Sequence, residues 1–451
     1  MARAIRSNEI DATTGPILKK LIIYALPVIG VSLLQILFNS ADVFVLSQFA
    51  SDAAVAAVGS TTVIVNLFVV FFIGLSLATN VLVARCKGAN DREGAKRFVG
   101  TSIATALLFG IAFSIIGVFC SKYFLIWTGC KESLFEMAER YLFIYCLGLP
   151  LVSLYNFCAS ILRAVGDTKR PFYYLLIGGV LNIILNVFFI VVLKKDVEGV
   201  AIATVASQGT SAILSLIACL KSEGFNALRV KYIKFNKYEF LQILKLGVPI
   251  ALGKCMFSIS NLVVQTGINS FSEDFIAGNT IAHQFDIIIH EVCDAFASSI
   301  MTFVGQNLGT KNFVRIKKIV CTNLVIVTIL GTTLGLMFIV FGSHICGIMT
   351  DSEEVIKYGV LRMQTLGIAY GLTGVMNTFA NTLRATGRAT TATVISLICT
   401  CLFRVVWMNT VFIWNHTEMV LFLVYPMSWI LCSIAFGITM VLHLKKISKN
   451  I

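Results

Sequence analysis

Long apolar stretches recur along the whole chain, and short polar loops separate them. Each stretch holds at least the roughly 20 residues that an α-helix needs to cross a bilayer. The pattern predicts twelve transmembrane helices, over residues 19–46, 54–84, 98–120, 134–162, 172–193, 199–220, 242–270, 278–308, 319–343, 356–383, 392–414 and 420–443.

The composition fits a chain that lies mostly in lipid. Hydrophobic residues make up 57% of the 451 residues and charged residues only 13%, with a mean hydropathy of +0.87. A soluble domain carries about 25% charged residues, so we predict an all-α polytopic membrane protein. The net charge of +13 does not indicate a nucleic-acid partner, because the basic residues lie in short loops between the apolar stretches.

The loops alternate in charge along the chain. One set is basic and includes RCKGANDREGAKR and KSEGFNALRVKYIKFNKYE, whereas the opposite set includes TDSEE and NHTE. Most of the 36 Lys and Arg lie in the first set and at the two termini. Basic loops stay on the cytoplasmic side of a membrane. We therefore expect a multi-pass protein of the plasma membrane, the inner membrane in a bacterial cell, with both termini in the cytoplasm.

The two halves of the chain repeat each other. Gly88 and Gly309 are separated by the same number of residues as Arg163 and Arg384, and Pro27 has a near counterpart in Pro249. Such self-similarity indicates repeated structural units. Parallel repeats are typical of transporters, with the substrate site between the halves. We predict a six-helix N-lobe over 1–220, a cytoplasmic linker over 221–240 and a six-helix C-lobe over 241–451.

Several motifs, taken in order, resemble one transporter family. They are LPVIG…FNSADVFVLSQF, VARCKGANDREGAKR, LRAVGDTKRP, VGQNLGTKN and LRATGRAT. The chain resembles a multidrug and toxic compound extrusion (MATE) transporter, of the bacterial branch similar to DinF. The resemblance covers essentially the whole chain.

This resemblance implies the fold of the MOP superfamily, with two pseudo-symmetric six-helix lobes in a V-shaped pair. It also implies a secondary active antiporter, not an enzyme, that exports organic and often cationic compounds in exchange for H⁺ or Na⁺ by alternating access. The expected partners are small organic cations or drugs and membrane lipid. No cofactor beyond the coupling ion is expected, and the protein is expected to be a monomer.

A carboxylate, Asp42, stands near the end of the first apolar stretch. It either lies hydrated at the outer interface or sits inside the membrane, where ionisable residues are functional candidates by default. The resemblance favours the second reading, because the family carries its membrane-embedded aspartate in this motif. The predicted ion-coupling residues are Asp42, Asn182, Asn186 and Thr204, and Gln35 and Asn39 join Asp42 as predicted substrate-binding residues.

The two asparagines of the fifth span are four residues apart and share one helix face. Each Asn either serves the ion site directly or makes a hydrogen bond between helices. The family often has an acidic residue at the position of Asn186, so this chain lacks one charge of the family's sodium site.

The eighth span, AHQFDIIIHEVCDAF, holds the densest polar cluster. Its members recur at three or four residues along one stripe, with Glu291 beside it. Three readings stay open: a cavity wall that binds a cation or relays protons, an internally paired Asp–His seam, or a divalent metal site. The stripe consists of His283, Asp286, His290 and Asp294, and all but His283 are predicted with Glu291 to bind substrate, as are Asn261 and Gln265 of the seventh span.

HEVCD is close to the HExxH motif of zinc proteases, but Asp294 replaces the second His. That motif needs two His one turn apart, so no enzyme and no metal site are assigned. Lys254 is expected to pair with an acid of the eighth span, and Arg362 and Arg404 to snorkel or pair structurally.

Pro27 removes a backbone hydrogen bond inside the first span. The resemblance implies a kink that bends with the ion switch of the N-lobe; the alternatives are a static kink or a cytoplasmic helix end. The alternative function is a lipid-linked oligosaccharide flippase of the same superfamily, although the acids at membrane depth favour cations.

Overall fold

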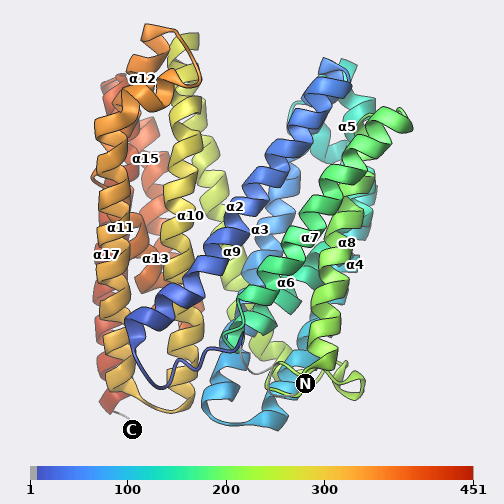
Figure 1. Ribbon diagram of the computed structural model, residues 1–451. Coiled ribbons are helices and arrows are strands. Elements are labelled where there is room, and N and C mark those ends of the chain that lie inside the picture. Colours follow the sequence, from blue (N-terminus) through green and yellow to red (C-terminus); the bar gives the residue numbers. More distant parts are fainter. Residues whose placement is uncertain (1–7, 450–451) are drawn as a thin grey trace. The chain divides into compact units, whose positions relative to one another are not determined.

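The computed structural model describes residues 8–449, and over these residues the regular structure is helical (Figure 1). The helices of the first half occupy the first six predicted spans. They are α2 (Ile17–Phe49), α3 (Asp52–Gly88), α4 (Arg92–Trp127), α5 (Glu132–Leu147), α6 (Leu149–Ala164), α7 (Lys169–Val187) with the π-helical turn η2 (Phe188–Val192), and α8 (Val197–Lys221).

A short 3₁₀ turn, η3 (Val230–Tyr232), lies in the basic segment that precedes the second half. The second half contains α9 (Lys237–Ile268), α10 (Glu273–Gly309), α11 (Phe313–Gly347), α12 (Glu353–Gly367), α13 (Tyr370–Ala385), α14 (Ala389–Ser396), η4 (Leu397–Leu402), α15 (Phe403–Asn409), α16 (Val411–Trp414) and α17 (Glu418–Lys449).

The predicted helical membrane fold is confirmed. Within the described residues ten helices are long and apolar enough to cross a membrane, and α5 with α6, bent by 46°, forms an eleventh candidate. The predicted span 356–383 corresponds to α12 and α13. That pair is less apolar because α12 carries charged side chains, namely Glu353, Glu354, Lys357 and Arg362.

The sequence repeat reappears in the backbone geometry. Asp91 caps α4 by accepting a hydrogen bond from the Gly94 N–H at 2.8 Å, and Asn312, its counterpart, caps α11 through the Arg315 N–H at 3.0 Å. Side-chain caps of this kind satisfy N–H groups that the first helical turn leaves unpaired.

A second pair of equivalent positions shares an unusual conformation. Gly166 and Gly387 have φ values of +86° and +93°, a region that glycine adopts without a steric penalty. The sequence of each half therefore dictates the same turn after its fourth span.

The contacts divide the chain into two compact units, and the boundary between the units falls within two helices, α2 and α9. The first unit comprises Pro27–Ala251 and the N-terminal stretch up to Asp11; the second comprises Ala12–Leu26 and Leu252–Ile451. The division falls at Pro27 in α2 and two residues after Pro249 in α9. Proline interrupts the helical hydrogen-bond ladder, so both crossings coincide with the weakest points of their helices. The lobe boundaries at 220 and 241 stay a prediction.

The first unit has an aromatic and aliphatic core among α3, α4, α5 and α8. Phe71 and Phe113 contribute with ring centroids 4.7 Å apart. The N-terminal half of α9 also joins this unit, because Gly74 allows the backbone of Ala251 to approach closely; a Cβ at Gly74 would lie 2.8 Å from the Ala251 nitrogen. Close approach through small residues is a usual way of packing helices in membranes.

The second unit is built around α10, which packs against α11, α12 and α13. Phe275 of α10 is fully buried and stacks on Phe422 of α17 with ring centroids 5.3 Å apart. Gly331 of α11 lies against Gly371 of α13, where an added Cβ would meet the Gly371 Cα at 2.7 Å.

Candidate functional site

Asp42 lies half-buried on the part of α2 that belongs to the first unit. The Asn186 Nδ2 atom, on α7, donates a hydrogen bond to Asp42 Oδ1 at 2.5 Å. The Thr204 hydroxyl, on α8, donates to Asp42 Oδ2 at 3.3 Å. Both carboxylate oxygens are therefore held by neutral donors from two neighbouring helices.

Asn182 completes this polar cluster from one turn earlier on α7. Its Nδ2 atom donates to the Thr204 Oγ1 at 3.4 Å, and its Oδ1 atom accepts from Asn186 Nδ2 at 3.3 Å. The structure thus brings together all four residues predicted for ion coupling. Asn182 and Asn186 are buried, because polar side chains of a membrane span turn to the protein interior and away from lipid.

The packing of α2 on α7 depends on a glycine. Gly179 lies directly against the Phe38 ring, so that a Cβ there would collide with it. Phe38 is one turn before Asp42, and this contact sets the position from which the carboxylate meets α7. Tyr141 and Tyr145 of α5 lie within electrostatic range of the Asp42 carboxylate.

One oxygen of the cluster has no hydrogen-bond donor within the described residues. The Asn186 Oδ1 atom is buried and unpartnered. A buried polar atom without a partner is rare in proteins and indicates a bound water or ion, or a functional role. It lies on the side chain that also bonds Asp42, so carboxylate and amide oxygens are available together to a small cation.

Gln35 and Asn39 occupy the same helix as Asp42 but stay outside this cluster. Asn39 is exposed and Gln35 is half-buried. No hydrogen bond links either side chain to Asp42 in the part of the chain that the structure describes. Their assignment to substrate binding stays a prediction.

The second unit contains a cavity of about 240 Å³ beside the polar stripe of α10. Five of the predicted polar residues line it together: His283, Asp286, His290 and Glu291 of α10, and Asn261 of α9. Asp294 is not part of the lining; its Oδ1 atom accepts a hydrogen bond from Asn377 Nδ2 at 3.1 Å. The residues from His283 to Glu291 therefore face the cavity. Asp294, at the C-terminal end of the stripe, instead bonds to α13.

Asp286 is the acid of a buried ion pair. Its Oδ2 atom lies 2.6 Å from Arg362 Nε, and its Oδ1 atom accepts a short hydrogen bond from the Tyr370 hydroxyl. Arg362 Nη1 donates to Asn279 Oδ1 at 2.6 Å. Asp286 thus pairs with an arginine and not with a histidine of its own helix, and its charge is already balanced.

Arg404 lies in the same cavity wall and is fully buried. Its Nη1 atom donates to Asn261 Oδ1 at 2.6 Å, and its Nε and Nη2 atoms both reach Ser428 Oγ at 3.3 Å. Of the two expectations for Arg404, snorkelling does not fit its full burial, whereas structural pairing agrees with the neutral acceptors that hold the guanidinium in the interior. Within the described residues no carboxylate lies within 4.0 Å of it.

The remaining predicted polar residues of α9 have separate contacts. Gln265 donates to Asn269 Oδ1 at 2.9 Å on its own helix and is not among the cavity lining. Lys254 makes no ion pair within residues 8–449, so the expected pairing with an acid of the eighth span is not found.

No group of three or more His, Cys, Asp and Glu side chains is arranged to hold a metal ion in the part of the chain that the structure describes. His290 instead faces the Phe257 ring, with centroids 6.3 Å apart.

The profile of the MatE family matches residues 27–188 and again residues 249–408. The two matches begin at Pro27 and Pro249, the repeated prolines, and together they cover most of the chain. The chain belongs to the MATE family of multidrug efflux transporters. It is therefore a multi-pass membrane transporter and not an enzyme.

Individual relatives agree over nearly the full length. The chain is 26% identical over 388 residues to a probable multidrug resistance protein, YpnP of Bacillus subtilis (strain 168), covering 86% of this chain and 87% of the relative. It is 23% identical over 365 residues to an FAD transporter of Shewanella oneidensis, covering 80% of each. A solved structure of a multidrug resistance MATE transporter, described as outward-facing, has the same fold, with a TM-score of 0.89, 19% identity, and coverage of 98% of this chain and 99% of that one.

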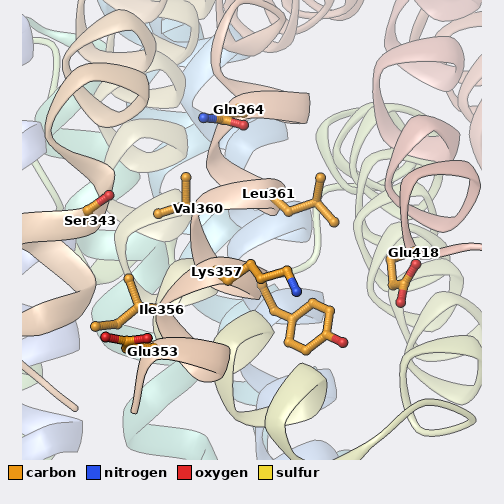
Figure 2. Close-up of a pocket in the computed structure, with 9 residues that line it drawn as sticks. Ser343, Glu353, Ile356, Lys357, Val360, Leu361, Gln364 and Glu418 are labelled. Atoms are coloured by element: carbon orange, nitrogen blue, oxygen red, sulfur yellow. The ribbon is translucent and has the colours of Figure 1, made fainter. Parts of the chain in front are cut away.

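A larger hollow of about 630 Å³ lies elsewhere in the second unit of this MATE transporter. Figure 2 shows that most of its labelled side chains come from α12, with Glu418 contributed by the start of α17. Lys357, on its wall, forms an exposed ion pair with Glu354 at 3.4 Å. Exposed pairs of this kind contribute little free energy, and the hollow holds no buried charge, so the cavity beside α10 is the stronger candidate site.

Asn279 and Tyr370 are absent from the residues predicted above, although both belong to the Asp286–Arg362 network. Asn279 lies seven residues before Asp286 on α10, and its spacing could have placed it on the polar stripe. Tyr370 begins α13 after a break in the helix, a position for which the hydropathy pattern gives no signal.

Proposed function

We propose that this MATE transporter is a secondary active antiporter that exports organic, often cationic, compounds in exchange for H⁺ or Na⁺. The observation that carries the proposal is the Asp42 cluster within the membrane-spanning helices of the first unit. A single carboxylate is held there between α2, α7 and α8 by neutral donors.

Exchange follows from competition for one negative charge. A proton or Na⁺ at Asp42 neutralises the carboxylate, and a cationic compound needs that carboxylate charged. The two ligands therefore exclude each other, and a gradient of one ion drives export of the other cation.

The neutral oxygens of Asn182, Asn186 and Thr204 support either ion. Hard cations take oxygen ligands from carboxylates and amides, and the unpartnered Asn186 Oδ1 is one such ligand. Proton binding needs only the Asp42 carboxylate and surrounding donors that tolerate both the charged and the neutral form of that carboxyl group. The cluster is therefore compatible with H⁺ and with Na⁺, and the efflux measurement distinguishes the two ions.

Alternating access of an N-lobe over 1–220 and a C-lobe over 241–451 is part of the proposal. It is supported by the prolines at which α2 and α9 pass from one compact unit to the other. The basic loops favour a plasma-membrane orientation with both termini in the cytoplasm.

The test is efflux of a fluorescent organic cation from proteoliposomes that contain the wild-type protein. An imposed pH gradient, an imposed Na⁺ gradient and no gradient are compared at equal ionic strength and clamped membrane potential. We expect one of the two gradients to accelerate efflux at least severalfold, and that gradient names the coupling ion. Efflux that ignores both gradients with several cations would contradict antiport.

Replacing Asn186 by Asp should change the ion dependence. The Asn186→Asp variant would place a second carboxylate at the 2.5 Å contact with Asp42, where two charges require a cation or a proton between them. We expect efflux by the variant to be stimulated by Na⁺ more strongly than efflux by the wild type. An unchanged Na⁺ response in Asn186→Asp would contradict a direct role of position 186.

A lipid-linked oligosaccharide flippase of the same superfamily is the second candidate function. The buried Arg404, without a carboxylate partner, is the observation that favours it, because such a lipid carries a pyrophosphate. Gradient-independent behaviour in the efflux assay would support this alternative.

A further inference from the structure

The cavity beside α10 contains four charged side chains in addition to two histidines. Asp286 and Arg362 form an ion pair and balance each other. Arg404 and Glu291 also line the cavity, and within the described residues neither forms an ion pair. The cavity therefore presents one uncompensated positive charge and one uncompensated negative charge at separate points of its wall.

Arg404 carries donors that the protein does not use. A guanidinium has five N–H donors, and three of them are engaged by Asn261 and Ser428. Burying a charge without an opposite charge is strongly unfavourable. A fully buried arginine with two free donors in a cavity wall is thus suited to a bound anion, which the planar guanidinium can hold through two parallel hydrogen bonds.

Aromatic rings surround this guanidinium. Its Cζ atom lies 4.8 Å from the centroid of Tyr425 and 5.4 Å from that of Phe257, and Trp429 and Tyr370 line the same cavity. The wall therefore provides ring faces next to an anion-binding group. At about 240 Å³ the cavity is smaller than the roughly 300–1,000 Å³ that is usual for drug-sized ligands, which limits the occupant to a small ring system.

We propose that this cavity binds the carboxylate of a small aromatic acid, with Arg404 as the anion-binding residue. The proposal deepens the proposed function, on which it rests, by giving the exporter a second recognition site with the opposite charge preference from Asp42. The Glu291 carboxylate on the same wall disfavours ligands with two negative charges and accommodates a positive group on the ring.

The first test compares 1-naphthoate with 1-naphthamide, which has a similar shape but no charge. Isothermal titration calorimetry is performed on the full-length purified protein in detergent, with no ion gradient. We expect the carboxylate to bind on the order of tenfold more tightly, the factor that corresponds to about 1.4 kcal/mol. Equal affinities, or tighter binding of the amide, would overturn the proposal whatever the variants do.

The second test assigns the preference to Arg404. Arg404→Gln should reduce the carboxylate-to-amide ratio to about one, whereas Arg404→Lys should retain part of it. Arg384→Gln is the matched control, because Arg384 is buried in the same unit but does not line the cavity. A ratio that survives in Arg404→Gln, or that falls equally in Arg384→Gln, would overturn the assignment; if Arg404→Gln does not fold, Arg404→Lys and the wild-type ratio decide.

An anionic lipid is the other source of a negative group. Adding phosphatidylglycerol to the micelles should leave the naphthoate affinity within about twofold, and displacement by the lipid would overturn an aromatic ligand in favour of a headgroup. Because no gradient is applied, binding can fail while gradient-driven efflux succeeds, or the reverse, so the two proposals fail separately.

Discussion

Asp42→Asn should reduce gradient-driven efflux of an organic cation to the leak of protein-free liposomes, a loss of at least about tenfold. The amide keeps the size of the side chain and its place between Asn186 and Thr204. It cannot, however, take up and release a proton, and it offers no negative charge to Na⁺ or to the cation. The variant is measured in proteoliposomes with the gradient that drives the wild type.

Asp52→Asn is the matched control for this variant. Asp52 is exposed in the first turn of α3, so its replacement makes the same chemical change outside the cluster and should leave efflux within about twofold. Normal gradient-driven transport by Asp42→Asn would show that Asp42 is a hydrated interfacial residue, and the coupling group would then have to be sought on α10.

The four residues of the Asp42 cluster could be predicted because each is a polar side chain within an apolar stretch. Asn182 and Asn186 are polar positions one helical turn apart in an apolar stretch, and Asp42 is a charge where the hydropathy pattern predicts membrane. Their assembly into one cluster could also be expected, because polar side chains in lipid face each other or a cavity when helices pack.

The partner of Asp286 could not be predicted in the same way. Asp286 and Arg362 lie on helices α10 and α12, which are far apart in the sequence, and the family resemblance gives no motif for the pair. Periodicity places Asp286 on a stripe but does not choose between a histidine, a lysine and an arginine as its partner. The partners of Arg404 could not be predicted for a related reason: its acceptors, Asn261 and Ser428, are ordinary polar residues of two other helices.

The role of one family motif also becomes clear only in three dimensions. VGQNLGTKN ends α10, and its Gln306 and Asn307 side chains hydrogen-bond the backbone of Ala12 at 2.9 and 3.0 Å. Arg315 adds bonds to the carbonyl oxygens of Thr14 and Gly15. A segment that hydropathy leaves as a polar tail is thus fixed to the second unit before α2 begins.

Breaking the Asp286–Arg362 pair should destabilise the protein by about 3–5 kcal/mol, since either partner alone leaves an uncompensated buried charge. Asp286→Asn leaves Arg362 with Asn279 and without its carboxylate; Arg362→Met leaves Asp286 with the Tyr370 hydroxyl alone. The free energy of unfolding is measured by urea titration in mixed micelles. Both single variants should lose stability by similar amounts.

The double variant separates the ion pair from simple packing. Asp286→Leu combined with Arg362→Met removes both charges, and because apolar side chains can replace a buried pair with little loss, it should recover more than half of the deficit. Lys357→Met is the control on the same helix, because it breaks only the exposed pair with Glu354 and should change stability by at most about 0.5 kcal/mol. A double variant that recovers none of the stability lost in Arg362→Met would contradict charge compensation as the contribution of this contact between α10 and α12.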